Sequence, residues 1–160
     1  MSTQIELFVL IIVANGAPIL LDNILGPRLR RPVDGGRVLR DGQRLLGGSV
    51  TVRGVVAAVA LPAGLAPLLS QGVAVGVVIG LLAMVGDAAS SWIKRRLGLA
   101  SSARAIGLDQ VPESLLPLLA LAPALDLGWR DIVVIVAAFT AFDLIISRVL
   151  YRLGWRNRPH

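Results

Sequence analysis

Residues 86–110 read GDAASSWIKRRLGLASSARAIGLDQ and connect two apolar segments of the chain. The stretch has an acid near each end, Asp87 and Asp109, and a basic triplet at residues 94–96. On a helix, Asp87, Ser91 and the first two basic residues recur at intervals of three or four, so they share a broad face. Two acids that can hold a divalent cation, beside a cluster of cations, suit a polyphosphate substrate. We therefore interpret this stretch as an active site at a membrane surface.

The composition is that of a membrane protein. Of the 160 residues, 55% are apolar and only 16% are charged, and the mean hydropathy is +0.75. The sequence has no cysteine and one histidine, His160, which excludes disulfides and thiolate sites and disfavours histidine-based catalysis. The net charge of +6 comes from arginines between apolar segments. Such arginines favour lipid headgroups and membrane topology as their explanation, and we expect no nucleic-acid partner.

Five apolar runs predict an all-α membrane protein, with residues 1–160 forming a single integral membrane domain. An ionisable group at the centre of a bilayer costs roughly 2.5 kcal/mol or more, so Asp87 indicates a function. Small residues at Gly76, Gly80 and Ala83 lead along one helix face to Asp87, which places the acid toward the packed interior. The predicted transmembrane helices cover residues 5–21, 55–69, 73–93, 111–125 and 132–150.

The distribution of arginines predicts the topology of a multi-pass protein of the cell membrane. Nearly every basic residue lies in the loops at residues 22–53 and 94–110 or in the C-terminal tail. By the positive-inside rule these segments are cytoplasmic, so the N-terminus lies outside and the C-terminus lies in the cytoplasm. Both polar loops and both acids are then on the cytoplasmic side.

Three further features allow two interpretations each. The glycines and arginines of residues 22–53 predict an ordered loop with a short interfacial helix around residues 37–46. This loop either binds phosphate or is simply a solvated positive loop. Asn15 and Pro18 interrupt the first apolar run and either belong to a site or only shape helix packing. Asp143, inside the fifth run, either joins the site or pairs with a neighbouring arginine, and we favour the pairing.

Short blocks in a fixed order carry a resemblance to a known family. The sequence resembles the CDP-archaeol synthase family, membrane cytidylyltransferases related to CDP-diacylglycerol synthases, over nearly its whole length. Each block is weak alone, but their order and spacing are specific. The blocks are NGAP at 15–18, RPVDGG at 31–36, DGQRLLG at 41–47, TVRG at 51–54, GD at 86–87, SWIKRRLG at 91–98 and LDQ at 108–110.

The resemblance implies a five-helix, Mg²⁺-dependent enzyme of phospholipid biosynthesis. It would join CTP to a lipid phosphate and release pyrophosphate, forming a CDP-activated lipid of the archaeol or diacylglycerol type. The enzyme itself would be surrounded by membrane lipids. It implies that Asp87 and Asp109 hold the metal and, with Lys94 and Arg95, are catalytic. The implied nucleotide and phosphate contacts are Asp34, Gly35, Arg37, Arg44, Thr51, Arg53, Gly54, Ser91, Arg96 and Gln110, and Asn15 and Pro18 form the implied site on the first helix.

The chain departs from the family pattern at Val50, where the family typically has a lysine. If that lysine contacts phosphate, Arg44 or Arg53 could take over its role, and we expect Arg53 to do so because it sits at the mouth of the second apolar run. The lipid acceptor stays open between ether-linked isoprenoid and ester-linked acyl chains.

Two other classes of function compete with a cytidylyltransferase. A phosphatidyltransferase acting on CDP-lipids would need several acids spaced along one helix, and residues 73–93 offer only Asp87. A small non-enzymatic membrane protein or a transporter could use Asp87 and Asp143 as a path for ions or protons. Attack of an already ionised lipid phosphate on CTP needs no general base, which agrees with the absence of a suitable histidine.

Overall fold

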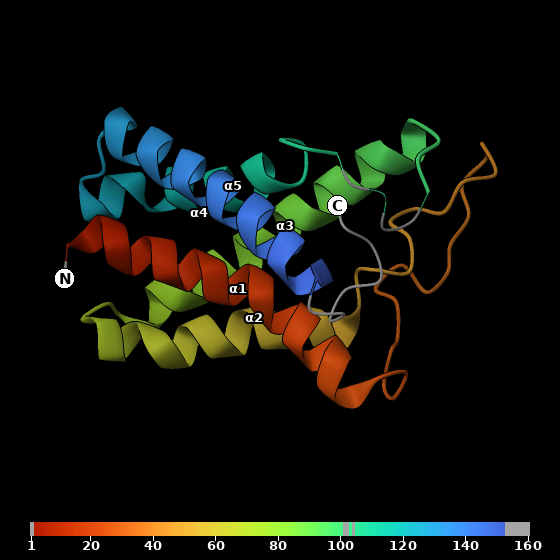
Figure 1. Ribbon diagram of the computed structural model, residues 1–160, viewed down its shortest axis with the longest axis horizontal. Coiled ribbons are helices and arrows are strands. Elements are labelled where there is room, and N and C mark those ends of the chain that lie inside the picture. The colour runs from red at the N-terminus through yellow and green to blue at the C-terminus, as the bar shows by residue number, and fades with distance from the viewer. Residues whose placement is uncertain (1, 101–102, 104, 153–160) are drawn as a thin grey trace.

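Five α-helices follow the five apolar runs in the computed structural model, which describes residues 2–100, 103 and 105–152 (Figure 1). Over the described residues the protein is all-helical, with isolated bridges in place of β-strands. The predicted fold class is therefore confirmed. The elements are α1 (Thr3–Leu25), α2 (Val52–Leu65), the 3₁₀ helix η1 (Ala66–Leu69), α3 (Val73–Arg96), α4 (Gln110–Leu125) and α5 (Trp129–Arg152).

Four of the helical segments are long and apolar enough to cross a membrane. They are α1, the continuous α2–η1 segment, α3 and most of α5. Helix α4 has 16 residues, about 24 Å at 1.5 Å per residue, against a hydrocarbon core of about 30 Å. The protein is thus a multi-pass membrane protein in which α4 is the short helix.

Glycines on α3 allow its neighbours to approach closely. A methyl group added to Gly76 or Gly80 would overlap the backbone of α2 at Pro62 or Ala58. On the same helix, a Cβ at Gly86 would lie 2.5 Å from the Pro112 carbonyl at the start of α4. Small residues pack helices in membranes by this kind of backbone contact. The predicted small-residue face of α3 is confirmed, and it packs α3 between α2 and α4.

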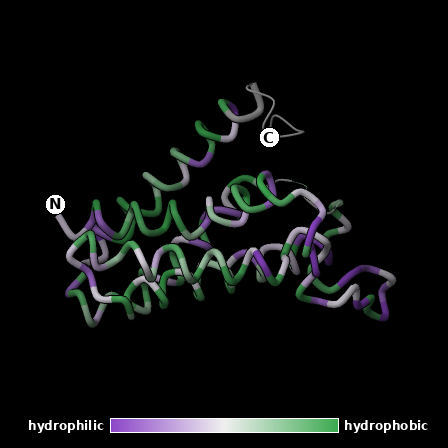
Figure 2. Tube along the Cα trace, turned by 90° about the horizontal axis from the view of Figure 1, so that it is seen from below, coloured by the Kyte–Doolittle hydropathy of each residue, from purple (hydrophilic) through white to green (hydrophobic). Residues whose placement is uncertain are grey.

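The apolar core lies where α1, α3, α4 and the first half of α5 meet. Its fully buried side chains include Leu10 from α1, Ile79 from α3 and Leu118 from α4, joined by Phe139 from α5. The second half of α5 leaves the bundle and tilts away from the other helices (Figure 2).

Both polar loops lie at the same end of the bundle, beyond the end of α3 (Figures 1 and 2). At the opposite end, Gln71 Nε2 donates to Glu6 Oε2 at 2.7 Å, and Gln4 Nε2 donates to Asp131 Oδ1 at 3.3 Å. The inference that the two loops share one side is confirmed. That this side is cytoplasmic stays a prediction, and most of the C-terminal tail lies outside the described residues.

The expected interfacial helix at residues 37–46 was wrong, because this segment forms a tight non-helical turn. Leu39 N donates to Gln43 O at 2.9 Å and Leu45 N donates to Arg37 O at 2.9 Å. Gly42, with φ of 76°, supplies the left-handed backbone at the tip. These cross-turn hydrogen bonds use the backbone groups that a helix would have paired along its own axis.

Candidate active site

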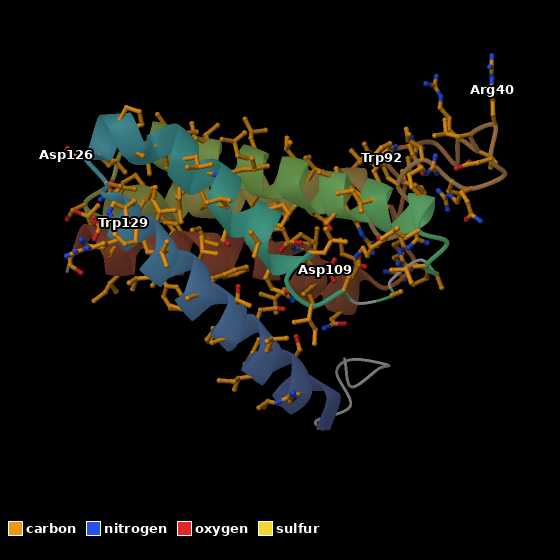
Figure 3. The ribbon with its side chains drawn as sticks, turned by 90° about the horizontal axis from the view of Figure 1, so that it is seen from above. Arg40, Trp92, Asp109, Asp126 and Trp129 are labelled. Carbon is orange, nitrogen blue, oxygen red and sulfur yellow. The ribbon has the colours of Figure 1, made fainter. Side chains whose placement is uncertain are left out.

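A buried ion pair connects α3 to the residue before α4. Lys94 Nζ lies 2.7 Å from Asp109 Oδ1, and the lysine is only 7% exposed. The other carboxylate oxygen of Asp109 accepts a hydrogen bond from Ala105 N at 3.0 Å. Figure 3 shows Asp109 between the loop end of the molecule, marked by Arg40, and the opposite end, marked by Asp126 and Trp129. The pair is therefore recessed into the bundle.

Asp87 shares the α3 face that carries Lys94, as the spacing predicted. Ser91, between them along the helix, hydrogen-bonds the Asp87 carboxylate, and Lys94 and Asp109 both act on it electrostatically. Ser90 is also buried, and its hydroxyl donates to the Asp87 backbone carbonyl at 3.0 Å. The structure thus brings together two acids far apart in the sequence around one ammonium group.

Glu113 is a further acid of this cluster, and the sequence analysis missed it. Its carboxylate lies within electrostatic range of Asp87, Asp109 and Asp143, and Lys94 is the cation that acts on it. Glu113 follows Asp109 by four residues and lies inside an apolar run. The rule that singled out Asp87, an ionisable group within an apolar helix, applied equally to Glu113.

Gln110 extends the polar network from α4 to α5. Its Oε1 accepts from Gly107 N at 2.9 Å, and its Nε2 donates to Asp143 Oδ2 at 2.8 Å. The side chain is 1% exposed, so both bonds are made away from solvent. Asp143 is therefore adjacent to the site, while its expected pairing with an arginine stays a prediction.

The cluster has more carboxyl groups than cationic groups. Asp87, Asp109 and Glu113 lie within electrostatic range of the Lys94 ammonium, and carboxylate oxygens are the donors that Mg²⁺ prefers. Among the described residues, no three acids come close enough together to form a metal cage on their own. Mg²⁺ commonly takes one or two carboxylates and completes its shell with water and substrate phosphates, so a pair of acids fits that ion.

Asp34 holds the long loop together. Its Oδ1 accepts from Gly36 N at 2.9 Å and from the Arg44 guanidinium at 2.7 Å. Its Oδ2 accepts from Leu46 N and Gly47 N, both at 3.1 Å. Burial raises the pKa of Asp34, but these four hydrogen bonds outweigh it and lower the pKa to about 2. The Asp34 carboxylate is thus occupied in organising the loop, whereas Gly35 and Arg37 are exposed on it.

The end of α3 is tied to this loop through Arg96. Its NH2 donates to the Arg44 carbonyl at 2.8 Å, and its NH1 lies 3.1 Å from Asp41 Oδ2. The neighbouring Arg95 donates to Ala100 O at 2.6 Å. Within the part of the chain that the structure describes, the Nε atoms of Arg44, Arg95 and Arg96 are buried and have no hydrogen-bond partner. These three guanidinium groups, at the end of α3 and in the long loop, therefore each keep an unused donor within the described residues.

Arg53 clamps the end of α1. Its guanidinium donates to Asp22 Oδ1, to Gly26 O at 2.7 Å and to Arg28 O, and the residue is 8% exposed. All of these partners belong to the protein, so Arg53 does structural work here, and its expected contact with phosphate stays a prediction. Val50, at the predicted departure from the family pattern, is 3% exposed and faces the interior.

The remaining predicted residues make local contacts. Thr51 caps α2 by accepting from Gly54 N at 3.2 Å. Pro18 packs against Gly54, where an added Cβ would lie 3.2 Å from the proline ring. Asn15 Nδ2 donates to Ile11 O of its own helix at 3.0 Å. These contacts shape the junction of α1 and α2, and the structure does not bring Asn15 and Pro18 into the acidic cluster through any described hydrogen bond.

Comparison with known proteins places this geometry in a family. Residues 63–160 match the family model described as CarS-like, CDP-archaeol synthase. The chain belongs to the CDP-archaeol synthase family. The resemblance seen in the sequence blocks is thus confirmed. The blocks within residues 86–110 lie inside the range of this CDP-archaeol synthase family member that the family model matches.

Full-length relatives and a solved structure agree. The CDP-archaeol synthase of Sulfurisphaera tokodaii is 35% identical over 150 residues, covering 89% of this chain and 90% of that protein. That of Aeropyrum pernix is 36% identical over 155 residues, covering 92% and 85%. A solved structure of an intramembrane enzyme for archaeal membrane lipid biosynthesis superposes with a TM-score of 0.76 at 35% identity, covering 89% of this chain and 91% of that one.

Proposed function

We propose that the protein transfers the cytidylyl group of CTP to a lipid phosphate at the cytoplasmic membrane face, forming a CDP-activated lipid and pyrophosphate. The observation that carries the proposal is the recessed pair of Lys94 and Asp109 beside Asp87, in a chain of the CDP-archaeol synthase family. A charged cluster inside an apolar bundle is costly and therefore indicates function. Its position below a basic loop suits a substrate with an apolar tail and an anionic head.

The chemistry needs positioning and charge stabilisation more than a base. The lipid phosphate oxygen attacks the α-phosphorus of CTP, and the bond to the β-phosphate oxygen breaks to release pyrophosphate. Such transfers depend on aligning the two oxygens and on neutralising the phosphoryl charge. Lys94, at the boundary between the acids and the basic loop, would exchange its bond with Asp109 for a phosphoryl oxygen.

The loop side of the site would hold the triphosphate. The unused Nε donors of Arg44, Arg95 and Arg96 are buried near the loop, and a guanidinium group can bind two phosphate oxygens at once. The contacts of Arg96 with the loop fix these donors relative to α3. Arg95 directly follows Lys94 on α3 and donates to Ala100 O.

We also propose that Asp87 and Asp109 hold Mg²⁺. Bound there, the ion would supply charge neutralisation for the phosphate oxygens of the nucleotide and of the departing pyrophosphate. The fit rests on the excess of carboxylates around Lys94. Glu113 lies within electrostatic range of both acids.

The test is CTP-dependent release of pyrophosphate by the purified protein in lipid nanodiscs. Asp87→Asn and Asp109→Asn should each abolish turnover, because an amide oxygen is a poor ligand for a hard cation. Asp126→Asn is the matched control, because Asp126 lies at the opposite end in a left-handed conformation that asparagine also tolerates. Normal metal-dependent turnover in either site variant would remove that residue from the metal site. A wild-type protein that releases no pyrophosphate from CTP when lipid phosphate is supplied would overturn the reaction itself.

A further inference from the structure

A groove of about 610 Å³ runs between α4 and α5. Val111 and Leu115 line it from α4, and Val133, Ala137 and Leu144 line it from α5. Thr140, its one hydroxyl-bearing wall residue, donates that hydroxyl to Val136 O of its own helix at 2.8 Å. The groove is therefore apolar throughout its length. Its α5 wall belongs to the helix that tilts away from the bundle (Figure 2).

One end of the groove meets the candidate active site. Val111 and Leu144 each follow a residue of the polar network, Gln110 and Asp143, whose side chains share a 2.8 Å hydrogen bond. Asp109 of the buried ion pair directly precedes Gln110. A molecule lying in the groove would thus have one end within the membrane interior and the other beside the acidic cluster.

Arg148 continues the groove face of α5 toward the loop end of the molecule. It follows Leu144 by four residues, and Leu144 follows Ala141 and Ala137 at helical spacing, so these residues lie along one stripe. Arg148 is exposed, and no described residue pairs with its guanidinium. A guanidinium at the polar end of an apolar groove complements an anionic head on a hydrocarbon tail.

We propose that the groove binds a hydrocarbon chain of the lipid phosphate acceptor and that Arg148 pairs with its phosphate. This inference rests on the proposed function and assigns it a site for the second substrate. Burial of the hydrocarbon chain against α4 and α5 provides affinity, and the phosphate contact fixes the depth of the lipid head. An annular lipid could fill the same apolar walls, but it would not depend on the guanidinium.

Photocrosslinking in nanodiscs tests the proposal without requiring turnover. The probe is a two-chain lipid phosphate with a diazirine midway along one chain, and its control is the same lipid lacking the phosphate. The phosphate probe should label α4 and α5 along the groove, and unlabelled lipid phosphate should compete while the uncharged lipid should not. Arg148→Gln should lower labelling about tenfold, the usual size of a lost charge-assisted contact, and Arg148→Lys should restore most of it.

Two alanines on α5 provide a matched pair of variants. Ala137 lines the groove, and Ala138 is an exposed neighbour outside its walls. Ala137→Trp should lower labelling about tenfold, as expected if the new ring displaces about two methylene groups of the chain. Ala138→Trp should leave labelling unchanged. Equal labelling by charged and uncharged probes, or equal loss in the two tryptophan variants, would mean annular lipid only and would overturn the proposal.

The outcome separates this inference from the proposed function. Formation of the CDP-lipid with an unchanged KM for lipid phosphate in both Ala137→Trp and Arg148→Gln would overturn the groove and leave the reaction standing. Specific labelling of the groove in a wild-type protein that forms no CDP-lipid would support the lipid site and overturn the reaction.

Discussion

Removing the Lys94 ammonium should destabilise the bundle strongly, because it leaves buried carboxylates without their cation. At the observed 2.7 Å, the attraction between Lys94 and Asp109 is about 6 kcal/mol for an effective dielectric constant of about 20. Desolvation offsets part of this, and breaking a buried pair from one side typically costs about 3–5 kcal/mol. Lys94 is 7% exposed, so solvent screening reduces this little. We expect Lys94→Gln to lower the free energy of unfolding by about that amount.

The measurement is unfolding in mixed micelles titrated with a denaturing detergent, without nucleotide. Arg130→Gln is the control, because Arg130 is exposed and stacks on Trp129 at 5.6 Å at the far end of the bundle, where such a contact is worth about 0.5–1 kcal/mol. The double variant Lys94→Gln/Asp109→Asn should regain part of the loss, since it removes the unpaired carboxylate. A loss under about 1 kcal/mol for Lys94→Gln, or a double variant with purely additive losses, would refute the reasoning.

Three further predictions follow from burial and topology. Gly86→Ala should lower the free energy of unfolding by about 1–3 kcal/mol because its methyl would overlap α4. Gly64→Ala, with open space around it, should raise the free energy of unfolding by up to about 1 kcal/mol. Similar effects of the two variants in mixed-micelle unfolding would contradict the close packing. Val50→Lys should destabilise the protein without lowering the apparent CTP constant in the pyrophosphate assay, because residue 50 is buried; a lower CTP constant would show that the lysine reaches the nucleotide. A cysteine label at residue 35 should react only from the cytoplasm and one at residue 71 only from outside, and labelling of both from one side would defeat the topology.

Sequence periodicity determined the helices and the face on which the α3 residues meet. Apolar runs long enough to cross a bilayer form helices because the backbone must satisfy its own hydrogen bonds there. Intervals of three and four then place Asp87, Ser91 and Lys94 on one face of α3 without reference to any other element. The same local rule applies to Glu113, an ionisable residue inside the apolar run of residues 111–125.

The long loop shows where local patterns fail. Its arginines and glycines suggested a short helix at residues 37–46. The fold instead uses the Asp34 carboxylate to hold the turn through Leu46 N and Gly47 N. It also uses Arg53 to clamp the end of α1, a task that is independent of the phosphate contact predicted for that residue. A side chain more than ten residues away from its partner leaves no periodic trace, so composition could not assign these tasks.

The depth of the acidic cluster was likewise decided only by the tertiary structure. In the sequence Asp109 follows a polar loop, which suggested that it lies at the membrane surface. Gly86 lets the start of α4 pack against the backbone of α3. Asp109, the residue before α4, therefore lies beside α3 and pairs with the ammonium of Lys94. The sequence by itself determined which residues are charged and which helices carry them. Their meeting inside the bundle depends on the close approach of two backbones, which only the packed helices define.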